Sequence, residues 1–110
     1  MLFISVEDFF TQASAIPRLS RDEEKDLAQR MAAGDQAARE ALVRGYLPMA
    51  AGRIRWAPRE IHTLRTVYAC IAAVEKSVDR FNFQQDSEPF VHHLGWALRQ
   101  CITRCIADQL

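Results

Sequence analysis

One face of a helix near the end of the chain carries the side chains best suited to chemistry. Its members recur at three- and four-residue steps, which place them together on a helix. They are His93, Trp96, Gln100 and Thr103, with Arg99 and Arg104 beside them. A large aromatic among amides, hydroxyls and cations is not typical of a core, although a tryptophan can also cover a core edge. The stripe favours a surface that meets something flat and polar, such as nucleic-acid bases.

The helix that must position this stripe is predicted over residues 87–110. Ser87 is suited to an N-cap, and Pro89 is acceptable in a first turn. Beyond them only Gly95 interrupts an otherwise helical pattern. A second, apolar stripe is predicted to face the core: Phe90, Val91, Leu94, Leu98, Cys101, Ile102 and Cys105.

The same helix carries a cysteine pair that could hold a metal. Cys101 and Cys105 are one turn apart, a spacing that can chelate zinc. His92 and His93 fall on another face, and small cysteines at apolar positions are ordinary core residues. Core packing is therefore the favoured interpretation, and neither a metal nor another cofactor is predicted. The sequence offers no catalytic constellation and no glycine-rich phosphate loop, so an enzyme is not expected.

A run of arginines lies at the middle of the chain. Arg53, Arg55 and Arg59 have only Glu60 to oppose them. A solvated helix face is the default interpretation of such a run. Contact with phosphates is the alternative that remains open.

The sequence predicts one all-α domain, a compact bundle of five or six helices. Its 110 residues can bury one modest core, and no strand alternation interrupts the helical patterns. An N-terminal helix is predicted within residues 1–15, a helix pair over 20–56, a long helix over 59–81 and the last helix over 87–110.

Local signals mark the ends of these helices. Residues 5–8 and 20–23 have the form of capping boxes, and Ile4 with Phe9 has the spacing of a hydrophobic staple. Gly34 is a natural helix stop. Pro48 lacks a backbone donor, so a kink or a restart of the helix is expected there.

Charge and cysteine content narrow the class of protein. Fourteen basic residues balance fourteen acidic ones, which argues against a strongly electrostatic binder of duplex DNA. Three cysteines within helical patterns are typical of a reducing cytosol. Since no apolar run approaches the length of a membrane span, a cytoplasmic protein without membrane contact is expected.

Several blocks, in order, resemble the housekeeping-type sigma factors of bacterial RNA polymerase. They cover residues 16–24, 27–30, 34–35, 37–43, 74–81 and 90–109. The block from 99 to 109 is the most specific, because it is similar to the helix with which these factors read the minus-ten promoter element. The resemblance implies the family's helical core domain, with RNA polymerase core and promoter DNA as partners.

The resemblance also implies roles for individual residues. Trp96 matches the first of the family's two stacking tryptophans, and Gln100 and Thr103 match contacts to the upstream edge of the element. His93 lies at the family's tyrosine position, and Arg99 and Arg104 would serve the phosphates. The helix over 59–81 would dock on the polymerase, with four candidate contacts: Val67, Tyr68, Ile71 and Glu75.

Departures from the family pattern support a second hypothesis. Ala97 stands where the family has its second tryptophan, and the usually basic loop is acidified at residues 84–88. Residues 68–70 replace the Gln-Glu-Gly of the docking surface, and the later domains have no counterpart, as in a fragment or a stand-alone copy. The chain is therefore either a working sigma-like domain or a protein-interaction module that regulates transcription, through polymerase or a regulatory protein, without reading DNA.

Overall fold

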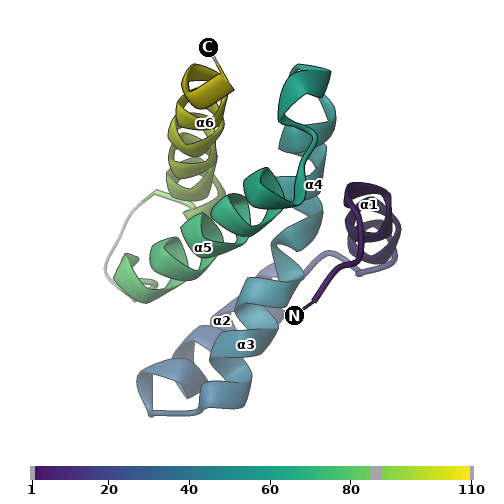
Figure 1. Cartoon of the computed structure of the whole chain (residues 1–110). Helices are drawn as coiled ribbons and strands as arrows, with labels where there is room; N and C mark the ends of the chain where they lie inside the picture. Colours follow the sequence, from purple (N-terminus) through teal and green to yellow (C-terminus); the bar gives the residue numbers. More distant parts are fainter. Residues whose placement is uncertain (1, 85–87, 110) are drawn as a thin grey trace.

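The fold is all-α, as the sequence predicts. The computed structural model describes residues 2–84 and 88–109, and within them the chain forms six α-helices and one short 3-10 helix. The elements are α1 (Val6–Ser14), α2 (Arg21–Ala32), α3 (Gln36–Gly45), α4 (Leu47–Arg55), η1 (Arg59–Ile61), α5 (Leu64–Arg80) and α6 (Phe90–Gln109). In Figure 1 the α2–α3 hairpin forms one end of the molecule, α5 crosses the middle, and α6 stands beside the far end of α4.

The first helix begins where it was predicted, but its entry is held differently. The Ser5 hydroxyl accepts a hydrogen bond from the Asp8 amide at 3.0 Å, which is one half of the predicted capping box. The Asp8 carboxylate accepts from the Ile4 amide, where the predicted box has the Ser5 amide. The predicted staple between Ile4 and Phe9 is wrong, because Ile4 is 89% exposed. Phe3 packs on Phe9 instead, with ring centroids 5.0 Å apart. Phe3 is buried and Ile4 is not, so the residue that packs on α1 lies two positions before the cap and not one.

Capping residues set the helix ends in the α2–α3 hairpin. Ser20 and Glu23 form the predicted capping box, with both reciprocal hydrogen bonds present at 2.9 and 3.1 Å. Gly34 ends α2 with a φ of 96°, a left-handed conformation that glycine adopts without strain. Asp35 then caps α3 by accepting a hydrogen bond from the Ala38 amide.

Removing the cap of α2 should destabilise the chain measurably. We expect Ser20→Ala to lower the free energy of unfolding by about 1 kcal/mol, because an N-cap hydroxyl is lost. Urea unfolding followed by circular dichroism would measure the difference. Ser14→Ala, which removes an exposed hydroxyl from the end of α1, is the control. Equal effects of the two substitutions would contradict the role of the cap.

The helix restarts before Pro48, as predicted. Tyr46 leaves the helical ladder between α3 and α4, and Pro48 then occupies the first turn of α4. A proline there sacrifices no hydrogen bond, because the first amides of a helix lack partners in any case. The break turns the chain so that α4 packs against α1, α5 and α6.

The long helix is shorter than predicted. Helix was expected over 59–81, whereas α5 begins at Leu64, after the separate 3-10 turn. The reason lies in Thr63, whose backbone is extended and whose hydroxyl accepts a hydrogen bond from the Thr66 amide at 3.2 Å. An extended N-cap interrupts the helical ladder, so Ile61 reaches the core from the turn and not from α5.

The last helix buries part of its predicted apolar stripe. Phe90, Leu94 and Leu98 are buried, and Cys101, Ile102 and Cys105 are half-buried. Val91 is exposed, which corrects its assignment to the core. It lies about 100° around the helix from Phe90, outside the face that packs on α5. The predicted cap, Ser87, and most of the acidified loop lie outside the described residues.

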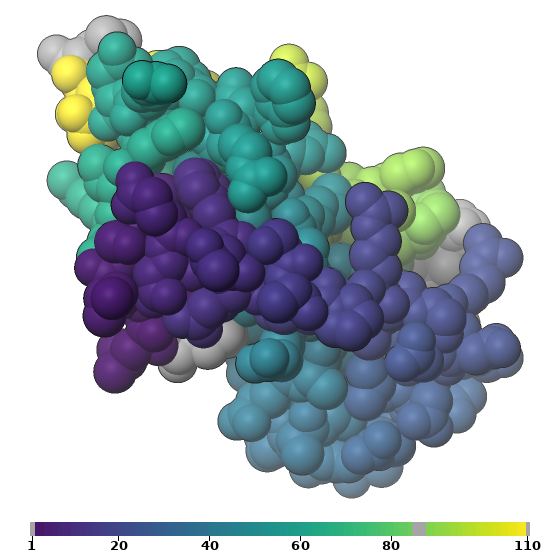
Figure 2. Space-filling view, turned by 90° about the vertical axis from the view of Figure 1, so that its right-hand side faces the viewer, coloured from purple at the N-terminus to yellow at the C-terminus, as the bar shows by residue number. Residues whose placement is uncertain are grey.

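One apolar core joins the helices. Its fully buried side chains include Phe9, Leu42, Leu47, Ile54, Val67, Val74, Val78, Phe90, Leu94 and Leu98. Figure 2 shows α1 lying across the middle of one face, above the α2–α3 hairpin. None of the described helices is both long and apolar enough to span a membrane.

A bidentate ion pair ties α3 to α5. Arg39 donates to both carboxylate oxygens of Asp79, at 2.6 and 2.8 Å. These hydrogen bonds lower the pKa of Asp79 below its usual value. A carboxylate with a lowered folded-state pKa stabilises the fold above its unfolded pKa of about 3.9, and this stabilisation is lost as the pH falls.

This pair predicts a pH dependence of stability. We expect Asp79→Asn to lower the melting temperature most at neutral pH, and the difference from the wild type to shrink as the pH falls through the lowered pKa of Asp79. Thermal melts at several pH values would measure it. Asp108→Asn, whose carboxylate forms no ion pair with the described residues, serves as the control. A difference that stayed constant with pH would contradict the interpretation.

Candidate nucleic-acid interface

The structure places the predicted stripe on the outer surface of α6. Trp96 is 62% exposed, and the other candidates on this helix are also exposed. Trp96 stands two residues from Leu94 and from Leu98, which are both fully buried. Two residues turn a helix by about 200°, so the indole must point away from the core. The apolar stripe thereby sets the orientation of the polar one.

The neighbours of Trp96 keep most of their polar groups free. No ion pair engages Arg99 or Arg104 within residues 2–84 and 88–109. The Thr103 hydroxyl donates to the Arg99 carbonyl at 2.8 Å, so its lone pairs remain available to a donor. His93 lies at the edge of the core, with its ring centroid 5.4 Å from that of Phe81.

An arginine from α4 joins this surface. A shallow depression is lined by residues of both helices: Arg53, Val91, His92, Gly95, Trp96 and Arg99. Gly95 permits the approach, because a Cβ at this position would lie 3.2 Å from the Arg53 guanidinium. Arg55 points elsewhere and stacks over Phe10 at 4.9 Å. The arginine run is thus divided between two sides of α4.

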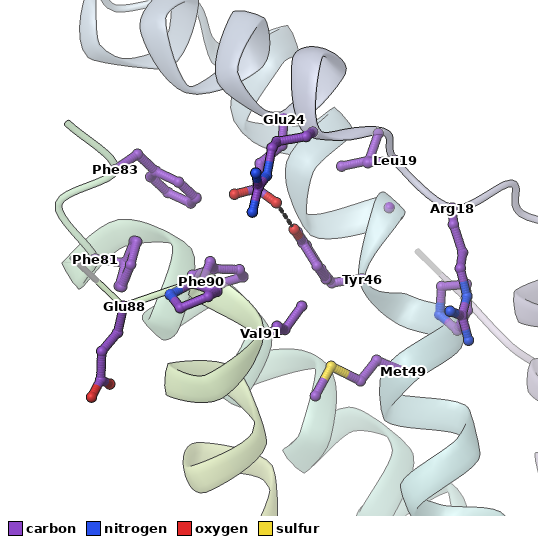
Figure 3. A pocket seen from close by; sticks show the side chains of 14 residues that line it. Arg18, Leu19, Glu24, Tyr46, Met49, Phe81, Phe83, Glu88, Phe90 and Val91 are labelled. Carbon is purple, nitrogen blue, oxygen red and sulfur yellow. Dashed lines mark hydrogen bonds between the residues drawn. The ribbon is translucent and has the colours of Figure 1, made fainter. Parts of the chain in front are cut away.

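A pocket that the sequence did not predict opens next to this face. It has a volume of about 600 Å³ and is lined by four separate segments of the chain. The aromatic and apolar lining comprises Leu19, Tyr46, Pro48, Met49, Phe81, Phe83, Pro89, Phe90 and Val91. In Figure 3 the three phenylalanines stand on one side, Arg18 and Leu19 stand on the other, and Glu88 turns its carboxylate away.

Tyr46 anchors the pocket. Its hydroxyl donates a hydrogen bond to the Glu24 carboxylate, drawn as a dashed line in Figure 3. Burial, followed by this carboxylate, raises the pKa of Tyr46, so the phenol stays protonated. Its ring meets Phe90 edge to face, with centroids 4.8 Å apart. Arg18 and Arg21 supply positive charge to the lining. An aromatic pocket with cations is suited to a flat, polar group attached to an anion.

No local signal in the sequence points to this pocket. Its lining comes from the α1–α2 link with the start of α2, the α3–α4 break, the α5–α6 loop and the start of α6. The aromatics of the last two segments are recognisable as apolar residues, but their convergence on Tyr46 depends on how α6 packs against α4.

The cysteines form a contact between α5 and α6. The Cys70 and Cys101 sulfurs lie 3.8 Å apart, and Cys70 is fully buried. A hydrogen bond from Cys70 lowers the pKa of Cys101, whereas burial raises that of Cys105. Among the described residues, no three histidine, cysteine or acidic side chains are grouped to hold a metal ion. His92 and His93 are exposed.

The predicted polymerase contacts divide into buried and accessible side chains. Val67 and Ile71 are buried in the core of this chain, so their side chains are not available to a partner on this surface. Tyr68 is 37% exposed, and its hydroxyl accepts a hydrogen bond from the Phe3 amide at 2.9 Å. Glu75 is half-buried. The three- and four-residue spacing that selected Val67 and Ile71 is the spacing of the core face of α5.

Comparison with known proteins identifies sequence similarity between this chain and sigma factors. Residues 5–37, from the cap of α1 to the start of α3, match the family model described as sigma-70 factor, region 1.2. RNA polymerase sigma factor SigA of Clostridium acetobutylicum is 32% identical over 111 residues, which cover 96% of this chain and 29% of that protein. SigA of a Bacillus species is 30% identical over 105 residues, which cover 94% of this chain and 28% of that protein. The chain thus spans less than a third of either relative.

Proposed function

Because this chain is a relative of the housekeeping-type sigma factors of bacterial RNA polymerase, we propose that it acts in transcription initiation. In this proposal α6 holds the single-stranded minus-ten segment of a promoter, and the exposed side of α5 contacts the polymerase core. The role is one of binding, without catalysis. The relatives support a role in transcription initiation, and the geometry of α6 supports single-stranded promoter DNA as a partner.

The observation that carries the proposal is the outer face of α6. An exposed tryptophan is flanked there by an amide, a hydroxyl and two guanidinium groups that form no ion pair with the described residues. Trp96 would stack on a base that has left the duplex, and Arg99 would hold the adjoining phosphate. Gln100 can address an adenine edge with paired hydrogen bonds. These are complementary contacts to one single strand.

The aromatic pocket provides a place for a second unstacked base. Its phenylalanines offer flat contact area, and Arg18 and Arg21 lie where phosphates would flank the entry. The hydrogen bond between Glu24 and Tyr46 fixes one wall in advance, so little ordering is required on binding. The pocket shares Val91 with the depression beside Trp96, so one strand can use both.

Charge predicts modest affinity for the chain alone. Its net charge is zero, so only local cations attract phosphates. Binding should therefore weaken with salt less steeply than for a strongly basic protein, and additional affinity must come from the polymerase complex.

Sequence discrimination tests the proposal directly. We expect the wild-type chain to bind a fluorescent minus-ten strand more tightly than a scrambled strand of the same composition. Gln100→Ala should reduce this discrimination by about 1–3 kcal/mol, because a bidentate base contact is lost. Gln29→Ala, which removes an exposed amide from α2, is the matched control. Equal binding of both strands by the wild type would overturn the promoter-reading role.

A second candidate function is favoured by the burial of docking candidates on α5. Two of the four docking candidates are buried, and Tyr68 already bonds the N-terminal segment. A module that binds polymerase or a regulatory protein without reading DNA would need neither Trp96 nor the pocket. Capture of core RNA polymerase together with an absence of strand binding would identify this function.

A further inference from the structure

Trp56, at the end of α4, is the feature that the function above does not use. The side chain is 89% exposed, more than that of Trp96, and it makes no ring contact or hydrogen bond with the described residues. An indole in water with no packing role is a large exposed apolar surface. The indole can therefore contact a partner, and its removal should not destabilise the fold.

The surroundings of Trp56 are cationic. Arg53 precedes it by three residues and Arg59 follows in η1, and both are exposed. Neither forms an ion pair within the described part of the chain. Only Glu60 opposes them locally in the sequence. An aromatic with cations beside it suits a single strand, since bases stack on the ring and phosphates meet the guanidinium groups. Arg53 also lines the depression beside Trp96, which favours the strand proposed for α6 over a separate protein partner.

The Trp56 surface is linked to the outer face of α6 through Arg53. Trp56 stands two residues beyond the fully buried Ile54, so it points away from the core, as Trp96 does on its own helix. The two helices are joined at Arg53, which lies against Gly95 and lines the depression beside Trp96. Three residues separate Arg53 from Trp56, a spacing that keeps both on neighbouring parts of one helix face.

We propose that Arg53, Trp56 and Arg59 bind a further segment of the same single strand, beyond the part held by α6. This inference rests on the proposed function and adds a second stacking position to it. Arg53 bridges the two positions through a phosphate, a further base stacks on Trp56, and Arg59 holds the next phosphate. The strand thereby runs from α6 across the end of α4.

Strand length tests this proposal. A strand of about 6 nucleotides carrying the minus-ten element is compared with strands of about 12 nucleotides, extended on either the 5′ or the 3′ side. Affinity for the full chain is measured by fluorescence anisotropy at several salt concentrations. We expect an extension on one side to increase affinity, and Trp56→Ala to remove that gain, which amounts to about 5- to 150-fold for one stacked base.

Matched variants separate stacking from charge. Trp56→Phe should restore most of the gain, because a phenyl ring also stacks. The double variant Arg53→Ala, Arg59→Ala should reduce the salt slope for the longer strand by about 0.7 per lost phosphate contact. Arg44→Ala removes one exposed arginine of α3, which lines a separate depression with Glu40 and Glu75, and should leave the slope unchanged. Circular dichroism would verify that each variant is folded.

The outcomes distinguish this inference from the function on which it rests. Binding of the short strand without any gain from extension would overturn the inference and leave the function intact. A gain that survives both Trp56→Ala and the double arginine variant would overturn it as well. Failure to bind either strand would overturn both. Fluorescence gives an independent result, since the chain has only two tryptophans. In a Trp96→Phe chain, quenching by the longer strand but not by the short one would support contact at Trp56.

Discussion

Phe90→Ala should be the most damaging single substitution for both the fold and the pocket. Phe90 is buried at the start of α6, and its ring centroid lies 4.8 to 5.2 Å from those of Tyr46, Phe81 and Phe83. Removing a buried phenyl ring costs the transfer free energy and leaves a cavity. We therefore expect the free energy of unfolding to fall by about 3–5 kcal/mol, measured by urea unfolding.

Two further variants make this prediction specific. Phe90→Leu retains most of the volume and should cost less, about 1–2 kcal/mol. Phe83→Ala removes a half-buried ring from the same cluster and should cost less than Phe90→Ala. If Phe90→Ala lowered the stability by no more than Phe83→Ala, the ring would not be the centre of the cluster.

Loss of Trp96 should have the largest effect on strand binding. We expect Trp96→Ala to weaken binding of the minus-ten strand by about 5- to 150-fold, because stacking on one aromatic is worth about 1–3 kcal/mol. The indole is 62% exposed, so the fold should be retained, and unfolding curves would verify this. Anisotropy titration at fixed salt would measure the affinity.

The pattern of effects of these substitutions separates base stacking from sequence discrimination. Stacking tolerates any base, so Trp96→Ala should weaken the scrambled strand as well, whereas Gln100→Ala should act mainly on discrimination. Trp96→Phe should recover part of the affinity. Unchanged binding after Trp96→Ala would contradict the role of α6 as a single-strand surface, and the protein-interaction function would then be preferred.

The two exposed tryptophans bear on a departure from the family pattern. Ala97 occupies the position of the family's second tryptophan. Under the further inference the second stacking position comes from Trp56 of α4, a neighbouring helix. Whether α4 carries this role is decided by the strand-length experiment and not by the resemblance.

Local features were readable from the amino-acid sequence because each depends on a few neighbouring residues. The caps at Ser5 and Ser20, the stop at Gly34 and the restart at Pro48 all involve contacts within four residues or restrictions on a single backbone unit. The outward orientation of Trp96 also followed from periodicity, since one buried stripe fixes the opposite side of a helix.

The sequence did not determine which helix face packs against a neighbouring helix. Val91 was predicted inside the core and is exposed. Val67 and Ile71 are buried in this chain, and their contact with polymerase stays a prediction. An apolar spacing identifies a stripe, but it does not state whether the stripe meets this chain or another one. Only the crossing of α5 with α4 and α6 decides that.

The sequence by itself determined the all-α class, most helix ends, the stripe on α6 and the relationship to the sigma factors. The tertiary structure alone decided the pocket around Tyr46, the sulfur contact of Cys70 with Cys101, and the place of Arg53 beside Gly95. Each of these joins residues that are far apart in the chain, so it depends on the relative placement of helices. Local propensities do not encode that placement, because it arises from the burial of all apolar faces together.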